Sequence, residues 1–291
     1  MDIIHSVSEL RSCLCSRPSS PENKIAAIGL VPTMGNLHEG HLDLVRIARA
    51  RVGVDGLVVM SIFVNRLQFG PNEDFDQYPR TFAEDAEKCR QAGVDVVFAP
   101  DEREMYPEPQ SYVIEPPDIQ HILDGAVRPG HFRGVATVVM KLFNMVQPSV
   151  AVFGKKDYQQ CRVLDSMTRQ FNMPIEIILA ETIRADDGLA LSSRNRYLSS
   201  SALMEAPQLF ATLMAIKSCL LAGRRDFDSI EAEALSRLTA RGWQPDYVTI
   251  RRQSDLLKLV ASDKASIMPL VILGAGRLGT TRLIDNLEVS L

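Results

Sequence analysis

The sequence predicts an α/β protein with a Rossmann-like, doubly wound parallel sheet, followed by a smaller C-terminal α+β domain. Short apolar runs rich in β-branched residues recur through roughly the first 180 residues, as is typical of strands buried on both faces. Amphipathic helical patterns stand between most of these runs, and this alternation implies right-handed crossovers. After about residue 183 the pattern changes, which indicates a second domain.

The expected strands of the first domain are nearly continuous apolar segments, at residues 25–31, 56–64, 94–99, 149–153 and 175–180. The expected helices repeat apolar residues at three- and four-residue intervals, at residues 42–51, 81–92, 135–146 and 158–171. Gly93 follows one of these helices and is a plausible stop signal. An open sheet of this kind binds ligands beyond the carboxyl ends of its strands.

The second domain is expected to contain two helices followed by three strands. We place the domain boundary in the turn at residues 183–187, so that the domains are residues 1–183 and 184–291. The expected helices are residues 201–221 and 228–241, and the expected strands are residues 247–252, 267–273 and 281–289. There is no long linker, so the second domain is expected to pack directly on the first.

Composition narrows the possible functions. The 291 residues are 46% apolar and carry a formal net charge of −4, with Lys and Arg scattered along the chain. Such a charge distribution favours neither nucleic acid nor an anionic membrane surface as a partner. The five cysteines have no paired C-x-x-C spacing, so we expect reduced thiols. The first residues do not resemble a signal peptide and no apolar segment is long enough to span a membrane, so we expect a cytoplasmic protein.

The most informative segment is His38-Glu39-Gly40-His41, between an expected strand and an expected helix. Two imidazoles three residues apart in the first helical turn lie on the same face, close to backbone N–H groups that the helix itself does not use. This arrangement is suited to a phosphate group. The pair could also be a polar helix start or half of a metal site. Glu39 is not a zincin-type base, because the H-E-x-x-H spacing is absent.

Further polar residues follow the ends of other expected strands. Their side chains are expected to meet in one crevice and to bind a triphosphate. Lys156 supplies a point charge, and Arg194 can bind two phosphate oxygens. The other candidates are the hydroxyls of Ser192 and Ser193, the glycines Gly35 and Gly154, which allow close backbone approach, and Asp157, which could bind a ribose.

Five segments together resemble the pantothenate synthetase (pantoate–β-alanine ligase) family, within the wider HxGH nucleotidyltransferase superfamily. Their order and spacing agree with the family along essentially the whole chain, and Thr281-Arg-Leu-Ile-Asp-Asn resembles the family's C-terminal strand. A lone H-x-G-H would indicate the superfamily alone, whereas the combination is specific. The five segments are residues 32–41, 61–74, 130–139, 153–160 and 191–199.

The resemblance implies an ATP-dependent ligase that joins pantoate and β-alanine through a pantoyl adenylate, with Mg²⁺ neutralising the triphosphate. It implies His41, His38 and Lys156 as catalytic residues, Gln68 and Gln160 as substrate amides, a homodimer, and a C-terminal lid. No protein ligand for a metal is assigned. The implied ATP contacts are Met34, Gly35, Asn36, Leu37, His38, Glu39, Gly40, His41, Gly154, Lys155, Lys156, Asp157, Ile183, Leu191, Ser192, Ser193 and Arg194.

Three positions depart from the family pattern. Lys155 stands where the family usually has Glu, Arg66 where it usually has Pro, and Asn36 where it often has Ala. The side chain at 155 therefore has no assigned role, and Arg66 could reshape the loop that presents Gln68. His131 and Arg133 are not assigned either; they could cover the substrate or stabilise a turn.

Two other functions share the triphosphate-binding pattern. A nucleotidyltransferase would move AMP or CMP onto a phosphorylated substrate and would not require β-alanine. A non-enzymatic nucleotide sensor would bind ATP without releasing pyrophosphate.

Overall fold

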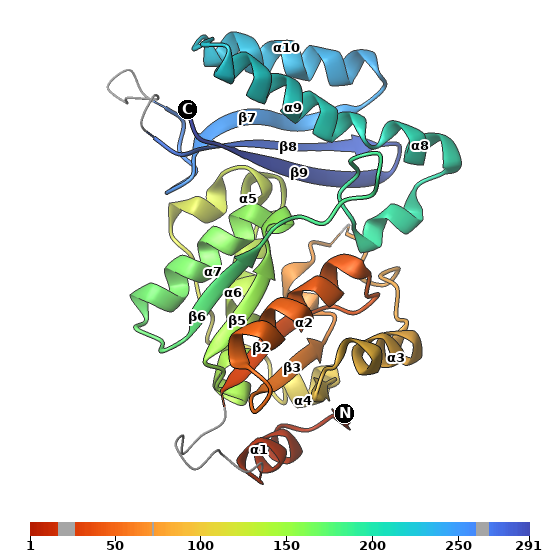
Figure 1. The fold of residues 1–291 in the computed structure, drawn as a ribbon, viewed down its shortest axis with the longest axis vertical. Helices are drawn as coiled ribbons and strands as arrows, with labels where there is room; N and C mark the ends of the chain where they lie inside the picture. The colour runs from red at the N-terminus through yellow and green to blue at the C-terminus, as the bar shows by residue number, and fades with distance from the viewer. Residues whose placement is uncertain (17–26, 72, 260–267) are drawn as a thin grey trace. The chain divides into compact units, whose positions relative to one another are not determined.

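The computed structural model describes residues 1–16, 27–71, 73–259 and 268–291 (Figure 1). The chain divides into two compact units. The first unit is residues 1–154 with 163–181, and the second is residues 155–162 with 182–291. The predicted fold class, a doubly wound parallel sheet followed by a smaller α+β part, is confirmed.

In the described part of the first unit, the strands form one parallel sheet with the order β1-β4-β3-β2-β5-β6. Chain order reverses between β2 and β5, which is the switch point of a doubly wound sheet. The loops that follow these two strands carry the His38–His41 segment and Lys156. The strands are β1 (Asp2–Ile4), β2 (Ile28–Thr33), β3 (Leu57–Ile62), β4 (Val96–Phe98), β5 (Val150–Gly154) and β6 (Glu176–Ala180).

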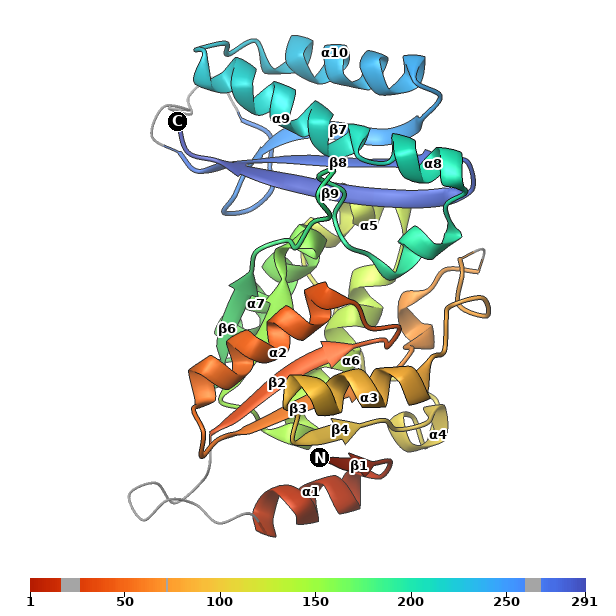
Figure 2. The same ribbon diagram turned by 45° about the vertical axis from the view of Figure 1, so that its right-hand side comes forward.

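The helices of the first unit cover the two faces of this sheet (Figures 1 and 2). The crossovers β2-α2-β3 and β3-α3-β4 run in one direction along the sheet, so right-handedness places α2 and α3 on one face. The crossover through α1 runs the other way, and α1 contacts α6. The α-helices are α1 (Val7–Ser16), α2 (Glu39–Val52), α3 (Phe82–Ala92), α4 (Glu102–Met105), α5 (Asp124–Val127) and α6 (His131–Val146).

Short 3₁₀ turns and one long helix complete this part of the chain. The helix α7 (Tyr158–Gln170) begins in the second unit and ends in the first. Two 3₁₀ helices, η1 (Arg66–Gln68) and η2 (Asp118–His121), lie in the first unit, and η3 (Lys155–Asp157) directly follows β5. The core of the first unit includes Leu44, Val45 and Ala48 of α2, which pack against apolar side chains of the parallel strands.

The second unit is a three-stranded antiparallel sheet covered by helices. The strand order is β7-β8-β9, so β9 is an edge strand of the described sheet and pairs with β8. Figures 1 and 2 show α9 and α10 along one face of this sheet. Its elements are η4 (Ser193–Tyr197), α8 (Ser200–Glu205), α9 (Gln208–Leu221), α10 (Phe227–Ala240), β7 (Gln244–Arg252), β8 (Leu270–Leu278) and β9 (Thr281–Val289).

The core of the second unit joins α9, α10 and the sheet. Leu213 and Leu220 of α9 are fully buried against Ile250 and Ile272. A Cβ added to Gly274 of β8 would lie 3.0 Å from Leu209 Cδ1, so glycine at this position allows α9 to pack closely on the sheet.

The structure corrects several predicted elements. The helix expected at residues 201–221 is two helices, because Pro207 has no N–H to continue the first one. The strand expected at 267–273 continues to Leu278, because Gly274 and Gly276 are paired within β8 and do not form a turn. The elements β1 and α1 were not predicted. Residues 25, 26 and 267 of two predicted strands, and Asn72 of a predicted motif, lie outside the described residues.

Candidate active site

His38 and His41 lie at the start of α2 in the first unit, as predicted. His38 is the residue before the helix, and its backbone N–H donates to Nδ1 of His41 at 3.3 Å. The two ring centroids are 4.1 Å apart. Because Nδ1 of His41 accepts a hydrogen bond, the proton of a neutral His41 is placed on Nε2. His41 therefore presents a donor at the far end of its ring.

The loop before these histidines is held by a buried carboxylate, Asp85 of α3. Its Oδ2 accepts from the backbone N–H of Asn36 and its Oδ1 from that of Leu37, both at 2.8 Å. Lys88, one turn further along α3, donates to the carbonyl of Leu37 at 2.7 Å. Gly35 and Asn36 are in the left-handed region, with φ of 80° and 51°, which glycine and asparagine tolerate best. A buried α3 side chain thus fixes the loop that leads to His38.

Gln68 lies next to Met34, so two of the predicted segments meet within the first unit. Gln68 Nε2 donates to the Met34 sulfur at 3.2 Å, and Asn65 Nδ2 donates to Gln68 Oε1 at 3.1 Å. Asn65 is 1% exposed and also accepts from the Tyr106 hydroxyl at 2.7 Å. Asn65 was not among the predicted site residues, although it lies in a segment that resembles the family.

The helix α6 approaches the Gln68 loop closely. A Cβ on Gly134 would lie 2.2 Å from the carbonyl oxygen of Leu67, so this position requires glycine. The buried ring of His131 contacts the carbonyl of Gln68 through Nδ1 at 2.8 Å and Arg128 through Nε2 at 3.0 Å. Arg128 is always a donor, so Nε2 accepts and Nδ1–H donates to Gln68. His131 thus supports the Gln68 loop, a role that was not among the two expected for it.

Burial and, to a lesser extent, the positive charge of Arg128 lower the pKa of His131 to about 4. The ring is therefore neutral at physiological pH, which its hydrogen bonds require. Arg128 is in turn paired with Glu73 through contacts of 2.7 and 2.5 Å.

Two of the three unusual positions make clear contacts in the first unit, Arg66 through its side chain and Asn36 through its backbone N–H. The guanidinium of Arg66 lies 3.9 Å above the Phe75 ring and contacts Glu102 at 3.1 Å. The side chain therefore lies along the surface of the loop that carries Gln68. Asn36 is 2% exposed and supplies one of the two N–H groups that Asp85 holds. Glu39 is exposed and forms an ion pair with Arg46.

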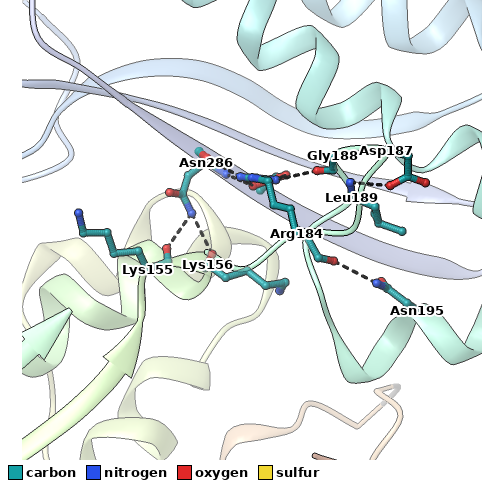
Figure 3. A network of polar contacts seen from close by, with 10 residues as sticks. Lys155, Lys156, Arg184, Asp187, Gly188, Leu189, Asn195 and Asn286 are labelled. Atoms are coloured by element: carbon teal, nitrogen blue, oxygen red, sulfur yellow. Dashed lines mark hydrogen bonds and ion pairs between the residues drawn. The ribbon is translucent and has the colours of Figure 1, made fainter. Parts of the chain in front are cut away.

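In the second unit, Lys155 and Lys156 follow the end of β5 and leave the chain in opposite directions (Figure 3). Lys155 forms an ion pair with Glu288 at 2.8 Å, and the Tyr158 hydroxyl also donates to Glu288 at 2.8 Å. The Lys156 ammonium is 3.8 Å from Asp157. The charge of Lys155 is thus offset by Glu288, whereas the Lys156 side chain extends on the other side of the loop.

The second predicted phosphate-binding segment is a short hairpin followed by η4. The N–H of Leu191 donates to the carbonyl of Ile183 at 2.9 Å, and Arg184 pairs with Ala190. Ser192 is the residue before η4, and its hydroxyl accepts from the N–H of Arg194 at 3.3 Å. Ser193 is buried and Arg194 is partly buried. Ile183, Leu191 and Arg194 are therefore brought together within the second unit.

The described residues contain neither a cluster of metal-binding side chains nor a membrane-spanning helix. Within residues 1–16, 27–71, 73–259 and 268–291, no three His, Cys, Asp or Glu side chains cluster as metal ligands would. In those ranges, too, no helix combines the length and apolar character needed to cross a membrane.

Comparison with known proteins gives a consistent result over the whole chain. The model of the family "Pantoate-beta-alanine ligase" matches residues 2–288. A pantothenate synthetase of Leptothrix cholodnii is 56% identical over 290 residues, covering 99% of this chain and all of that protein.

Two solved structures agree with the fold as well. The crystal structure of pantothenate synthetase from Thermus thermophilus has a TM-score of 0.89 and 43% identity, and each chain is covered completely. The pantoate-beta-alanine ligase of Francisella tularensis, solved as a complex with "Beta-gamma ATP and Beta-alanine", has a TM-score of 0.80 and 34% identity, with 99% of this chain and 97% of that chain covered.

These matches decide between the three functions that the triphosphate-binding pattern allowed. A nucleotidyltransferase or a nucleotide sensor would share part of the chain's motifs, whereas the agreement extends from residue 2 to residue 288. The chain belongs to the pantoate–β-alanine ligase family and is an ATP-dependent enzyme that condenses pantoate with β-alanine to form pantothenate.

Proposed function

We propose that the ligation proceeds in two steps. In the first, the carboxylate of pantoate attacks the α-phosphorus of ATP, which forms pantoyl adenylate and releases pyrophosphate. In the second, the amine of β-alanine attacks the acyl carbon, and AMP leaves as pantothenate forms. The complex named for the Francisella tularensis relative, with an ATP species and β-alanine, supports these two as ligands of this chain.

His41 is the proposed donor to the α-phosphate. The observation that carries this proposal is the hydrogen bond from the N–H of His38 to Nδ1 of His41, because it places the proton of the neutral ring on Nε2. The Nε2–H can then donate to a phosphate oxygen as negative charge builds up on it. A donor in this position is typically worth about 100- to 1000-fold in rate. His38, whose ring lies beside that of His41, is the second proposed catalytic histidine.

The remaining proposed ATP contacts are cationic and hydroxyl side chains. Two anions meet in the first step, so cationic groups must offset their repulsion. We assign this role to Lys156 and Arg194, with the hydroxyls of Ser192 and Ser193 as further donors. Mg²⁺, when bound to the triphosphate, neutralises part of its charge. The chemistry fits, because Mg²⁺ is commonly held by substrate phosphates and water with few protein ligands.

Gln68 and Gln160 are the proposed amides for pantoate, with Gln68 also close to β-alanine. Support for Gln68 comes from its surroundings in the first unit. Its side-chain oxygen accepts from Asn65 and its backbone carbonyl accepts from His131, so both the side chain and the backbone of Gln68 are held. A held amide binds hydroxyl and carboxyl oxygens with less loss of side-chain entropy.

The test measures the release of AMP and pyrophosphate with pantoate and β-alanine supplied separately and together. The two-step proposal expects pantoate alone to support exchange of labelled pyrophosphate into ATP, and AMP release to require both pantoate and β-alanine. Exchange that needs β-alanine would overturn the adenylate intermediate. The expected homodimer, the cytoplasmic location and the role of the C-terminal unit as a lid stay predictions; sedimentation of the purified enzyme tests the first.

A further inference from the structure

The side chain of Asn286 holds the loop that carries Lys156. Asn286 lies in β9 and is 6% exposed. Its Nδ2 donates to the carbonyl of Lys155 at 2.8 Å and to that of Lys156 at 3.0 Å (Figure 3). A carboxamide nitrogen has two hydrogens, so one side chain serves both carbonyls. These carbonyls cannot donate, which fixes the orientation of the amide.

A second contact of β9 strengthens this attachment. Glu288 is two residues beyond Asn286 and therefore on the same face of the strand. It contacts Lys155 and Tyr158, each at 2.8 Å. The segment from Lys155 to Tyr158 is thus fixed to β9 through both its backbone and its side chains.

The neighbouring residue Asp285 holds the second phosphate-binding segment. Its carboxylate, 5% exposed, forms a two-point contact with Arg184 at 2.7 and 2.8 Å. Arg184 also donates to the carbonyl of Gly188 at 3.0 Å and lies 3.6 Å above the Phe210 ring. Arg184 is the first residue of the hairpin that leads into Ser192–Arg194. Two consecutive residues of β9 therefore hold the segments that carry Lys156 and Arg194.

We propose that Asn286 is a positioning residue of the ligation reaction: it acts through the backbone of residues 155 and 156 to place the Lys156 ammonium for the adenylation step. The inference rests on the proposed role of Lys156. This inference assigns a function to the C-terminal segment Thr281–Asn286, which resembles the family but had no role assigned from the sequence.

The test is a graded series at Asn286 measured by pantoate-dependent pyrophosphate exchange. Asn286→Ser keeps one hydroxyl donor and Asn286→Ala keeps none. We expect exchange to fall about tenfold or less in the first and about ten- to hundredfold in the second, because small misplacements of a catalytic group have effects of this size. Asp246→Asn is the matched control. It weakens the 2.7 Å contact of Asp246 with Arg282, which also attaches β9, and it is expected to keep the wild-type exchange rate.

Lys156→Ala and the double variant separate positioning from stability. If Asn286 acts through Lys156, Asn286→Ala lowers exchange no more than about twofold once Lys156 is alanine. An equal factor in both backgrounds would show that Asn286 supports the fold alone and would overturn the inference, as would wild-type exchange in Asn286→Ala. Should Asn286→Ala not fold, Asn286→Ser with and without Lys156→Ala gives the same cycle. A wild-type enzyme without pantoate-dependent exchange would instead contradict the proposed adenylation.

Discussion

Two loops follow the neighbouring strands β2 and β5, and they are held by opposite chemistry. In the first unit, the Asp85 carboxylate accepts from the N–H groups of Asn36 and Leu37. In the second unit, the Asn286 amide donates to the carbonyls of Lys155 and Lys156. Both anchors are buried and both come from distant parts of the sequence.

The difference indicates how each loop can bind an anion. Asp85 draws two backbone N–H groups toward itself, so the loop after β2 depends on the imidazoles of His38 and His41 at the start of α2. Asn286 binds carbonyl groups, so holding the loop after β5 does not consume N–H donors, and Lys156 adds a full charge. In the proposed reaction, the first loop would therefore supply directed donors and the second a cation.

His41→Ala is expected to produce the largest effect, because it removes the directed donor of the first loop. We expect pantoate-dependent pyrophosphate exchange to fall about 100- to 1000-fold while the melting temperature stays within a few degrees of the wild type. His5→Ala, at an exposed histidine of the same unit, is the control and should leave exchange unchanged. A wild-type rate in His41→Ala would remove His41 from its proposed role.

Asp85→Asn tests the anchor of the same loop and should act mainly on stability. The amide loses the charge and one acceptor, so two charge-assisted hydrogen bonds are weakened and a buried N–H loses its partner. We expect the free energy of unfolding to fall by about 3–5 kcal/mol, measured by urea denaturation. Glu84→Gln makes the same charge change at an exposed neighbour in α3 and should cost less than about 0.5 kcal/mol. Equal losses in the two variants would contradict the anchoring role.

The sequence predicted the positions of the proposed site residues in the two loops better than it predicted their anchors. His38 and His41 stand where a strand pattern changes to a helix pattern, so their place at the start of α2 followed from local periodicity. Asp85 stands beside Glu84 in the first turn of α3, where acidic residues are usually solvated. Its burial arises from packing against the loop after β2, which no local pattern records.

Asn286 shows the same limit from another side. Its strand was predicted with the observed bounds, residues 281–289, because alternation and β-branched residues are local properties. The partners of its amide are more than 100 residues away in the sequence, so no local pattern predicts them.

Two elements of the fold were missed for different reasons. The break between α8 and α9 at Pro207 could have been predicted from the missing N–H, whereas β1 is three residues long and too short to give a periodic pattern.

A third anchor, His131, sharpens the comparison because it donates to a carbonyl, as Asn286 does, but lies in the first unit. Its pKa is lowered to about 4, from an unfolded value near 6.5, by burial and by Arg128. Between these values the unfolded chain binds a proton that the folded protein does not. The contribution of the neutral His131 to the free energy of unfolding is therefore fully present above about pH 6.5. It is lost as the pH falls toward 4, by about 2–3 kcal/mol in total.

His131→Gln should remove this part of the acid dependence. We expect the unfolding free energy of the variant to change less between pH 6.5 and 4 than that of the wild type, measured by urea denaturation at a series of pH values. The nearby charges of Arg128, Glu73 and Asp124 are the same in both proteins, so their titration cancels in the difference. Identical acid slopes in the two proteins would rule out a neutral His131 as the support of the Gln68 loop.

Reversing the charge of Lys155 should have the smallest effect. It separates the ion pair of Glu288 with Lys155 from the hydrogen bonds of Asn286, the two kinds of contact by which β9 holds the loop after β5. Lys155→Glu places two carboxylates together at Glu288, and we expect it to lower the unfolding free energy by about 1 kcal/mol. Adding Glu288→Lys restores an ion pair and should recover most of that loss. Pyrophosphate exchange should change less than about twofold in either variant, because the Lys155 side chain extends away from Lys156 (Figure 3) and Asn286 still holds both carbonyls. A larger loss of exchange, recovered in the double variant, would show that the ion pair and not the amide positions Lys156.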